Sequence, residues 1–141
     1  MFGTRRSILI LAMVGLALPA CGGNGSGDNG GVTVTLRDFE ITLAQDTLPA
    51  GTVSFDIRNE GPSVHEFVVF RTDLAPDALP TNNAGEVDEE GEGVKLVDEV
   101  EDIAVDATAT LDVDLDPGSY AAVCNLPGHY AQGMATGFTV E

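Results

Sequence analysis

Residues 124–134 near the C-terminus read CNLPGHYAQGM, and this stretch is the most informative part of the sequence. It contains Cys124, His129 and Met134, with four residues between each successive pair. Thiolate, imidazole and thioether are donors that copper prefers, and one Cys with two His and a long axial Met makes an electron-transfer copper site. The second imidazole is available, because His65 is the only other histidine in the chain. The segment therefore predicts a metal site that adds His65 to the three residues of the loop.

Other interpretations of Cys124 remain open at this point. A buried, unreactive thiol is a common role of an isolated cysteine. A Cys–His hydrolytic pair is chemically conceivable, but it leaves His65 and Met134 without a role. Zn²⁺ also accepts Cys and His donors. Because Cys124 lies in a loop with two further donors, we favour the role of a copper ligand.

The N-terminus predicts export from the cytoplasm. Arg5 and Arg6 precede an apolar run of 11 residues, 8–18, which is shorter than the ~20 residues that a membrane-spanning helix needs. The run ends at a small residue, Ala20, as a secretory signal does. We therefore expect residues 1–20 to be a signal peptide. The arginine pair also resembles a loose twin-arginine signal, so both Sec and twin-arginine export stay open.

Cys21 predicts a lipid anchor. The sequence Leu-Pro-Ala-Cys at 18–21 resembles a bacterial lipobox, in which the Cys is lipidated and becomes the first mature residue. The alternative is a free or disulfide-bonded thiol. Residues 22–31 read GGNGSGDNGG, which has no apolar residue and is typical of a flexible tether. We thus expect 21–31 to be lipidation site and linker, and 32–141 to be one folded domain.

The charge balance limits the kinds of partner. All 23 acidic residues follow Cys21, but only four of the six basic residues do, which gives the mature chain a net charge of −19. Such a surface repels nucleic acids and anionic lipids, so we expect no nucleic-acid partner. It would attract a basic protein. Solubility or adaptation to salt explains the same charge equally well.

The hydrophobic pattern predicts an all-β domain. Apolar and polar residues alternate with period two in several short runs, which is typical of half-buried antiparallel strands. Turn signals such as Asn-Glu-Gly-Pro at 59–62 separate the runs. The expected strands cover 32–37, 40–44, 53–58, 65–71, 94–100, 111–116, 119–124 and 136–140. Between them we expect an excursion around 72–93, with a short helix at 73–79 and then a polar surface loop.

These features together resemble the cupredoxins, the type 1 blue copper proteins. The resemblance covers residues 32–141, and the Cys-x4-His-x4-Met spacing is most similar to that of the rusticyanin and sulfocyanin-like group. It implies a Greek-key β-sandwich in which the ligand loop joins the last two strands. It also implies one type 1 copper ion, with His65, Cys124 and His129 as equatorial ligands and Met134 as the axial ligand.

The function implied is one-electron transfer rather than enzymatic catalysis. We expect a monomer, tethered by lipid to the outer face of a bacterial or archaeal cell membrane, in the periplasm or at the cell surface. Its partner would be a redox protein such as a cytochrome or a terminal oxidase. The alternative is an extracytoplasmic copper-handling protein that delivers or sequesters the metal. Enzymes of the multicopper oxidase kind need many more histidines than two.

Two details near the site carry separate expectations. In many cupredoxins the residue after the first His ligand is Asn or Ser, but here it is Glu66, whose carboxylate would either accept backbone N–H groups or turn to solvent. A negative charge there would favour Cu(II). Apolar residues around His129 are expected to form either a docking patch or ordinary loop packing; they are Leu126, Pro127, Tyr130 and Ala131.

Overall fold

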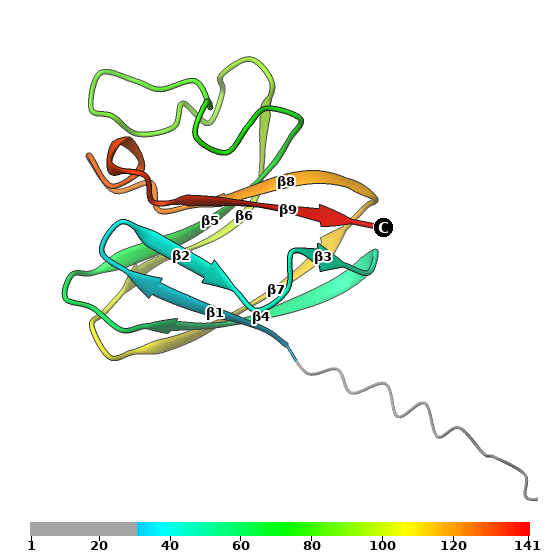
Figure 1. Cartoon of the computed structure of the whole chain (residues 1–141), viewed down its shortest axis with the longest axis horizontal. Coiled ribbons are helices and arrows are strands. Elements are labelled where there is room, and N and C mark those ends of the chain that lie inside the picture. Colours follow the sequence, from blue (N-terminus) through cyan, green and yellow to red (C-terminus); the bar gives the residue numbers. More distant parts are fainter. Residues whose placement is uncertain (1–30) are drawn as a thin grey trace, which may run out of the picture.

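The computed structural model describes residues 31–141 and folds them into two packed β-sheets (Figure 1). The signal peptide, Cys21 and nearly all of the linker predicted from the sequence lie outside the described residues. Among residues 31–141, no helix has the length and apolar character needed to cross a bilayer.

The first sheet has four strands in the order β2-β1-β4-β7. Their bounds are β1 Val32–Arg37, β2 Glu40–Leu43, β4 Gly51–Asn59 and β7 Thr108–Leu115. β1 pairs with β4 in parallel and with β2 through an antiparallel hairpin. In that hairpin Arg37 pairs with Glu40, so that only Asp38 and Phe39 form the turn.

The second sheet has five strands in the order β3-β9-β8-β5-β6. Their bounds are β3 Thr47–Leu48, β9 Ala135–Val140, β8 Gly118–Val123, β5 His65–Thr72 and β6 Val94–Ile103. The chain passes from β4 into this sheet at β5, returns to the first sheet at β7 and comes back at β8. The prediction of a Greek-key β-sandwich is confirmed, and each of the eight expected strands is present. The short strand β3 was not predicted.

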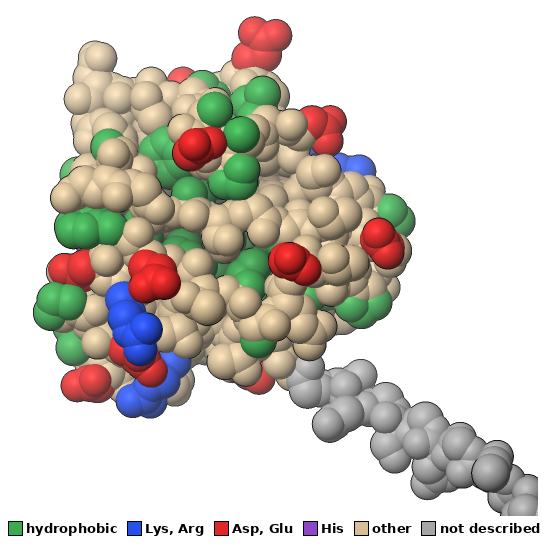
Figure 2. Space-filling model, in the orientation of Figure 1, with side chains coloured by type: hydrophobic (Ala, Val, Ile, Leu, Met, Phe, Trp, Pro, Cys, Tyr) green, Lys and Arg blue, Asp and Glu red, His purple; other side chains and the backbone are tan. Residues whose placement is uncertain are grey.

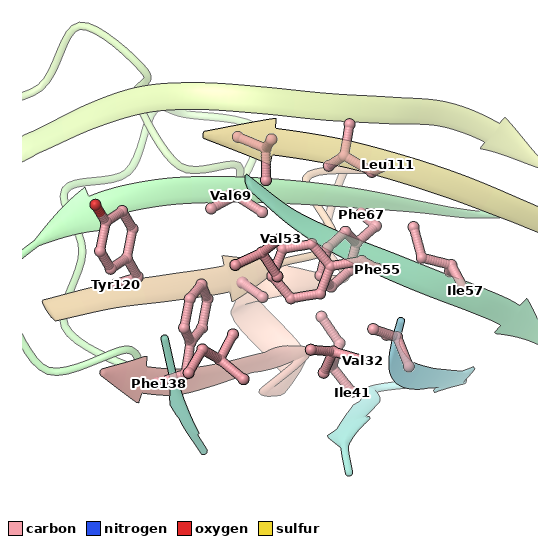
Figure 3. Close-up of a cluster of buried hydrophobic side chains, with 14 of the residues drawn as sticks. Val32, Ile41, Val53, Phe55, Ile57, Phe67, Val69, Leu111, Tyr120 and Phe138 are labelled. Atoms are coloured by element: carbon pink, nitrogen blue, oxygen red, sulfur yellow. The ribbon is translucent and has the colours of Figure 1, made fainter. Parts of the chain in front are cut away.

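Aromatic side chains join the two sheets across the core (Figure 3). Phe55 on β4 lies 5.3 Å from Phe67 on β5 and 5.8 Å from Phe138 on β9, measured between ring centroids. Phe138 also stacks on Tyr120 of β8 at 5.3 Å. Aromatic pairs of this kind contribute about 0.5–1.5 kcal/mol each beyond their burial. They hold the strands that carry the candidate site in fixed relative positions.

The excursion between β5 and β6 is a loop and contains no helix. The expected helix at 73–79 is therefore wrong: this part of the chain has only isolated turns. Pro76 lacks the N–H that a helix interior requires. Its carbonyl accepts the Tyr130 hydroxyl at 2.9 Å, and the same hydroxyl accepts the Leu79 N–H at 2.9 Å. Packing against Tyr130 thus satisfies backbone groups that a helix would otherwise pair.

The loop also covers the outer face of the second sheet. Leu79 and Val87 are buried in a second apolar cluster together with side chains of β5 and β8 and with Tyr130. This cover explains why the β5 sequence HEFVVF is apolar on both faces of the strand rather than alternating. The excursion is therefore a structural layer and not only a polar surface loop.

Removing the Tyr130 hydroxyl tests this role. We expect Tyr130→Phe to destabilise the domain by about 1–3 kcal/mol, because the buried Leu79 N–H loses its acceptor. Urea unfolding measures the loss, and hydrogen exchange should become faster at the Leu79 amide. Tyr120→Phe is the matched control, because its hydroxyl donates to the Asp116 carbonyl elsewhere and should leave exchange at Leu79 unchanged. An unaltered Leu79 amide in Tyr130→Phe would contradict the assignment.

Candidate metal centre

The candidate donors come from strand ends and from the loop between β8 and β9, which is the orange-to-red loop in Figure 1. His65 is the first residue of β5, and Cys124 directly follows β8. β5 and β8 are antiparallel neighbours, with Val68 opposite Val123, so these two donors lie at the same end of the sheet. His129 precedes a single 3-10 turn, η1 (Tyr130–Gln132), and Met134 precedes β9.

Three of the four predicted donors converge. The Cys124 Sγ lies 3.8 Å from the His65 Nδ1 and 3.4 Å from the His129 Nδ1. The donor atoms of His65, Cys124 and His129 all lie within 4.8 Å of one another, which is close enough for all three to hold one metal ion. The two imidazole rings meet edge to face at 5.3 Å. Both rings therefore turn Nδ1 toward the thiol, as ligands of one small ion would.

Met134 lies at the base of the same loop. Its side chain is fully buried, in the same apolar cluster as Cys124. Its carbonyl accepts the Cys124 N–H at 3.1 Å, and its N–H donates to the His129 carbonyl at 3.2 Å. The structure thus brings the Met134 backbone next to Cys124 and His129 and buries the Met134 side chain in the core.

Glycines permit the two sharp bends of the loop. Gly128 has a φ of 79° and Gly133 a φ of 98°, in the left-handed region that residues with a Cβ rarely adopt. Each glycine directly precedes a donor, His129 or Met134. Both glycines therefore allow a tight turn beside a donor.

Burial controls the protonation of the donors. It lowers the pKa of His65, as does the nearby His129, while Asp38 acts in the opposite direction. Burial also raises the pKa of the Cys124 thiol, against the effect of the Glu66 and Leu126 N–H groups. Burial thus already favours the neutral imidazole of His65, whereas a bound cation would favour the thiolate of Cys124 and release the thiol proton.

The donor set fits copper. A thiol, two imidazoles and a thioether form a soft set of the kind that copper takes. Cys124 is a buried, free cysteine among the described residues, and the Glu66 N–H donates to its sulfur at 3.4 Å. The structure therefore provides a compact, largely desolvated set of donors that suits this metal.

Comparison with known families decides the classification. Residues 7–136 match the sequence profile of the cupredoxin-like domain family, which is most of the chain. The chain belongs to the cupredoxin-like family. Since cupredoxins bind one copper ion and the donors cluster here, the prediction of copper as the cofactor is confirmed.

Solved structures agree with this cupredoxin fold. Reduced auracyanin from the photosynthetic bacterium Roseiflexus castenholzii superimposes with a TM-score of 0.56 and 19% identity, over 77% of this chain and 94% of that one. Rusticyanin from Thiobacillus ferrooxidans superimposes with a TM-score of 0.54 and 18% identity, over 77% of this chain and 76% of that one. Auracyanin B superimposes with a TM-score of 0.53 and 21% identity, over 78% of this chain and 87% of that one. At these identities the likeness shows the fold. Curated protein sequences give no significant match.

The four residues expected around His129, either as a docking patch or as loop packing, divide between the two: Leu126 is half-buried against the main apolar cluster. Tyr130 is buried, with 6% of its surface exposed, so it belongs to the loop packing and not to a surface patch. Phe39, which the sequence did not suggest, instead packs edge to face against His129 at 5.7 Å and is 39% exposed. Pro127 and Ala131 are exposed, as expected.

Two asparagine side chains that are not candidate donors hold the chain in place around this cupredoxin's metal centre. The Asn125 side chain accepts the Val87 N–H at 2.6 Å and donates to the Val87 carbonyl at 3.2 Å, which ties the loop to the excursion. Asn59 is fully buried and donates to the carbonyls of Ser63 and Ile103, each at 2.8 Å. The turn signal at 59–62 pointed to Asn59, whereas no sequence signal pointed to Asn125.

Glu66 lines a hollow of about 560 Å³, most of whose other lining residues are acidic. The structure shows no hydrogen bond from its carboxylate to another described residue. Burial, and then repulsion from Glu101, Glu99, Asp102 and Glu89, raises the pKa of Glu66 from 4.5 to about 7. At neutral pH this carboxyl is therefore only partly ionised, and its charge near the site is smaller than the sequence suggested.

The raised pKa predicts a pH dependence of stability in the metal-free protein. The stability gained by keeping Glu66 protonated is complete below pH ~4.5 and is lost as pH rises through ~7. Because Gln cannot ionise, Glu66→Gln should lose less stability than the wild type between about pH 5 and pH 8. Urea midpoints at both values measure this, with the exposed Glu92→Gln as control. Parallel pH profiles for wild type and Glu66→Gln would contradict it.

Proposed function

We propose that this cupredoxin carries single electrons between redox proteins outside the cytoplasm. The observation that carries the proposal is the convergence of two imidazole Nδ1 atoms on one buried thiol. In this assignment His65, Cys124, His129 and Met134 would hold one type 1 copper ion. Bound copper would supply one-electron redox chemistry between a reduced and an oxidised partner protein.

The chain's own contribution is a rigid set of donors. A backbone hydrogen bond joins Cys124, at the end of β8, to Met134, just before β9. His65 is fixed at the start of β5. Donors held this firmly change position little when the charge of the ion changes. A small rearrangement is what fast electron transfer requires, so the fold favours a carrier.

The electron would enter and leave at His129. Of the three converging donors, His65 and Cys124 have no exposed surface, whereas His129 is half-buried. Exposed apolar groups occur beside these histidines, with Phe39 against His129 and Val64, 41% exposed, directly before His65. We propose this apolar edge as the contact surface for a cytochrome or a terminal oxidase, and a monomer as the active form.

The acidic surface supports a secondary role in docking. Acidic side chains are spread over the face shown in Figure 2, and most of the Lys and Arg side chains on this face lie at its lower left. Charge spread over this face gives solubility and long-range attraction rather than one defined contact, whereas acidic side chains gather around the hollow at Glu66. We therefore assign the specific contact to the apolar edge around His129.

A copper-handling role is the alternative function. Proteins that deliver copper favour open or Met-rich sites, from which the metal leaves readily. Here Met134 is the only methionine of residues 31–141, and its side chain is fully buried. The closed site favours an electron carrier, and cupredoxins in general are electron-transfer proteins rather than enzymes.

Export and anchoring complete the proposal. The apolar run at 8–18 and Cys21 support a signal peptide at 1–20, followed by lipid attachment at Cys21. The Gly-rich residues 22–31 would then tether the domain to the outer face of the cell membrane. Such a tether lets the domain turn its His129 edge toward partners in the same membrane.

The copper-loaded protein should show an intense thiolate-to-Cu(II) band in the visible spectrum and fast electron self-exchange. Replacing the thiolate should remove both, so we expect Cys124→Ser to lose the band and most of its Cu(II) affinity while the metal-free domain stays folded. Absorption spectra and NMR line widths of mixed Cu(I) and Cu(II) samples measure this. A blue Cys124→Ser protein would refute the ligand assignment, and slow exchange in a blue wild type would favour copper handling.

The anchor is tested separately. We expect Cys21→Ser to move the protein from the membrane fraction to the soluble fraction of its host, because the lipid acceptor is gone. The copper spectrum of the released protein should match that of the wild type, since the linker is not part of the site. Retention of Cys21→Ser in the membrane fraction would exclude lipidation of Cys21 as the anchor.

A further inference from the structure

The β1–β2 turn lies directly against the metal centre. Its two residues, Asp38 and Phe39, each contact one of the candidate histidines: Asp38 lies beside His65, and Phe39 lies edge to face against His129. This turn is not part of the ligand motif at 124–134, yet it contacts both histidines of the site.

The first observation concerns the outward nitrogen of His65. Nδ1 faces the thiol, and Nε2 is completely buried without a well-aligned hydrogen-bond partner. The Asp38 Oδ1 lies 3.2 Å from this Nε2, close enough to accept a hydrogen bond but off the direction of the N–H. A buried N–H without a hydrogen-bond partner is unfavourable. The carboxylate is thus the group available to satisfy it.

The second observation is that the Asp38 carboxylate is held in place. Its Oδ2 accepts the Ser63 hydroxyl at 3.0 Å, and its Oδ1 accepts the Ser63 N–H at 3.3 Å. Ser63 is in turn fixed by Asn59, which donates to its carbonyl at 2.8 Å. A chain of hydrogen bonds therefore runs from the buried Asn59 to the carboxylate that faces His65.

The third observation is strain in the turn. Phe39 has a φ of 64°, a conformation that is uncommon for a bulky residue and is usually given to glycine. Such outliers persist only where surrounding contacts fix them, and they cluster at functional sites. Here the strained residue has its ring on His129, while its neighbour Asp38 lies beside His65.

We propose that Asp38 is the positioning residue of the metal centre: its carboxylate accepts the Nε2–H of His65 and thereby fixes the tautomer that presents Nδ1 to the metal. Partners of this kind orient a histidine ligand and make it a stronger donor. The negative charge of Asp38 also favours the higher oxidation state of an ion bound at Nδ1. This inference rests on the metal centre proposed above.

Two substitutions separate orientation from charge. Asp38→Ala removes the acceptor, so we expect Cu(II) affinity to fall about 10- to 100-fold and His65 in the metal-free protein to become a mixture of tautomers. Asp38→Asn keeps an oxygen acceptor but removes the charge, so the tautomer should stay fixed while the reduction potential rises. Nitrogen NMR of the His65 ring reports the tautomer, and voltammetry reports the potential.

Asp46→Asn is the control for the loss of one negative charge. Asp46 is exposed and directly precedes β3, which pairs with the C-terminal end of β9, whereas the ligand loop precedes the N-terminal end of that strand. Its potential should therefore remain close to that of the wild type. Circular dichroism shows whether each variant folds, and a folded Asp38→Asn suffices for the potential.

The outcomes separate this inference from the proposed function. If the wild type binds copper but Asp38→Asn shifts the potential no more than Asp46→Asn, and Asp38→Ala keeps a single His65 tautomer, Asp38 has no positioning role. If the wild type shows no thiolate–copper band, the proposed function itself fails. The tautomer measurement then still tests the Asp38–His65 contact, because it is made on the metal-free protein.

Discussion

The hydrogen bond from the Cys124 N–H to the Met134 carbonyl, 3.1 Å long, closes the base of the ligand loop and is the contact on which the site depends. It joins the end of β8 to the start of β9, so the loop between them cannot open without breaking the sheet. Two glycines with positive φ allow the enclosed residues to turn sharply, at 128 and 133. The result is a short loop whose donors are fixed by the strands rather than by the metal.

The other side of the site depends on a second set of buried polar contacts. Asn59 pairs with backbone groups at Gly61, Ser63 and Ile103, and so sets the entry of the chain into β5 at His65. Buried polar networks with all partners satisfied specify one arrangement of the chain. Through Ser63 this network reaches the Asp38 carboxylate, which lies 3.2 Å from the His65 Nε2. The two parts of the site are the loop between β8 and β9 and the connection from β4 to β5 that ends at His65. Each part is held in place by its own hydrogen bonds.

Most of the fold and the donor set could be predicted because their signals are local. Period-two alternation marked the strands, and the motif at 124–134 marked three donors. The inward position of Tyr130 and the loop at 73–79 were missed, because both depend on a tertiary contact between them. The Asp38 contact was missed for the same reason, since Asp38 and His65 are distant in the chain and no pattern couples them.

We expect the fold to hold the same donors around the metal in both oxidation states. X-ray absorption spectroscopy of the copper-loaded protein, measured as Cu(II) and as Cu(I), tests this most directly. The spectra should show one sulfur at thiolate distance and two imidazole nitrogens in both states, with only small changes in bond length. Loss of an imidazole on reduction, or a Cu(I) site with sulfur donors alone, would contradict it.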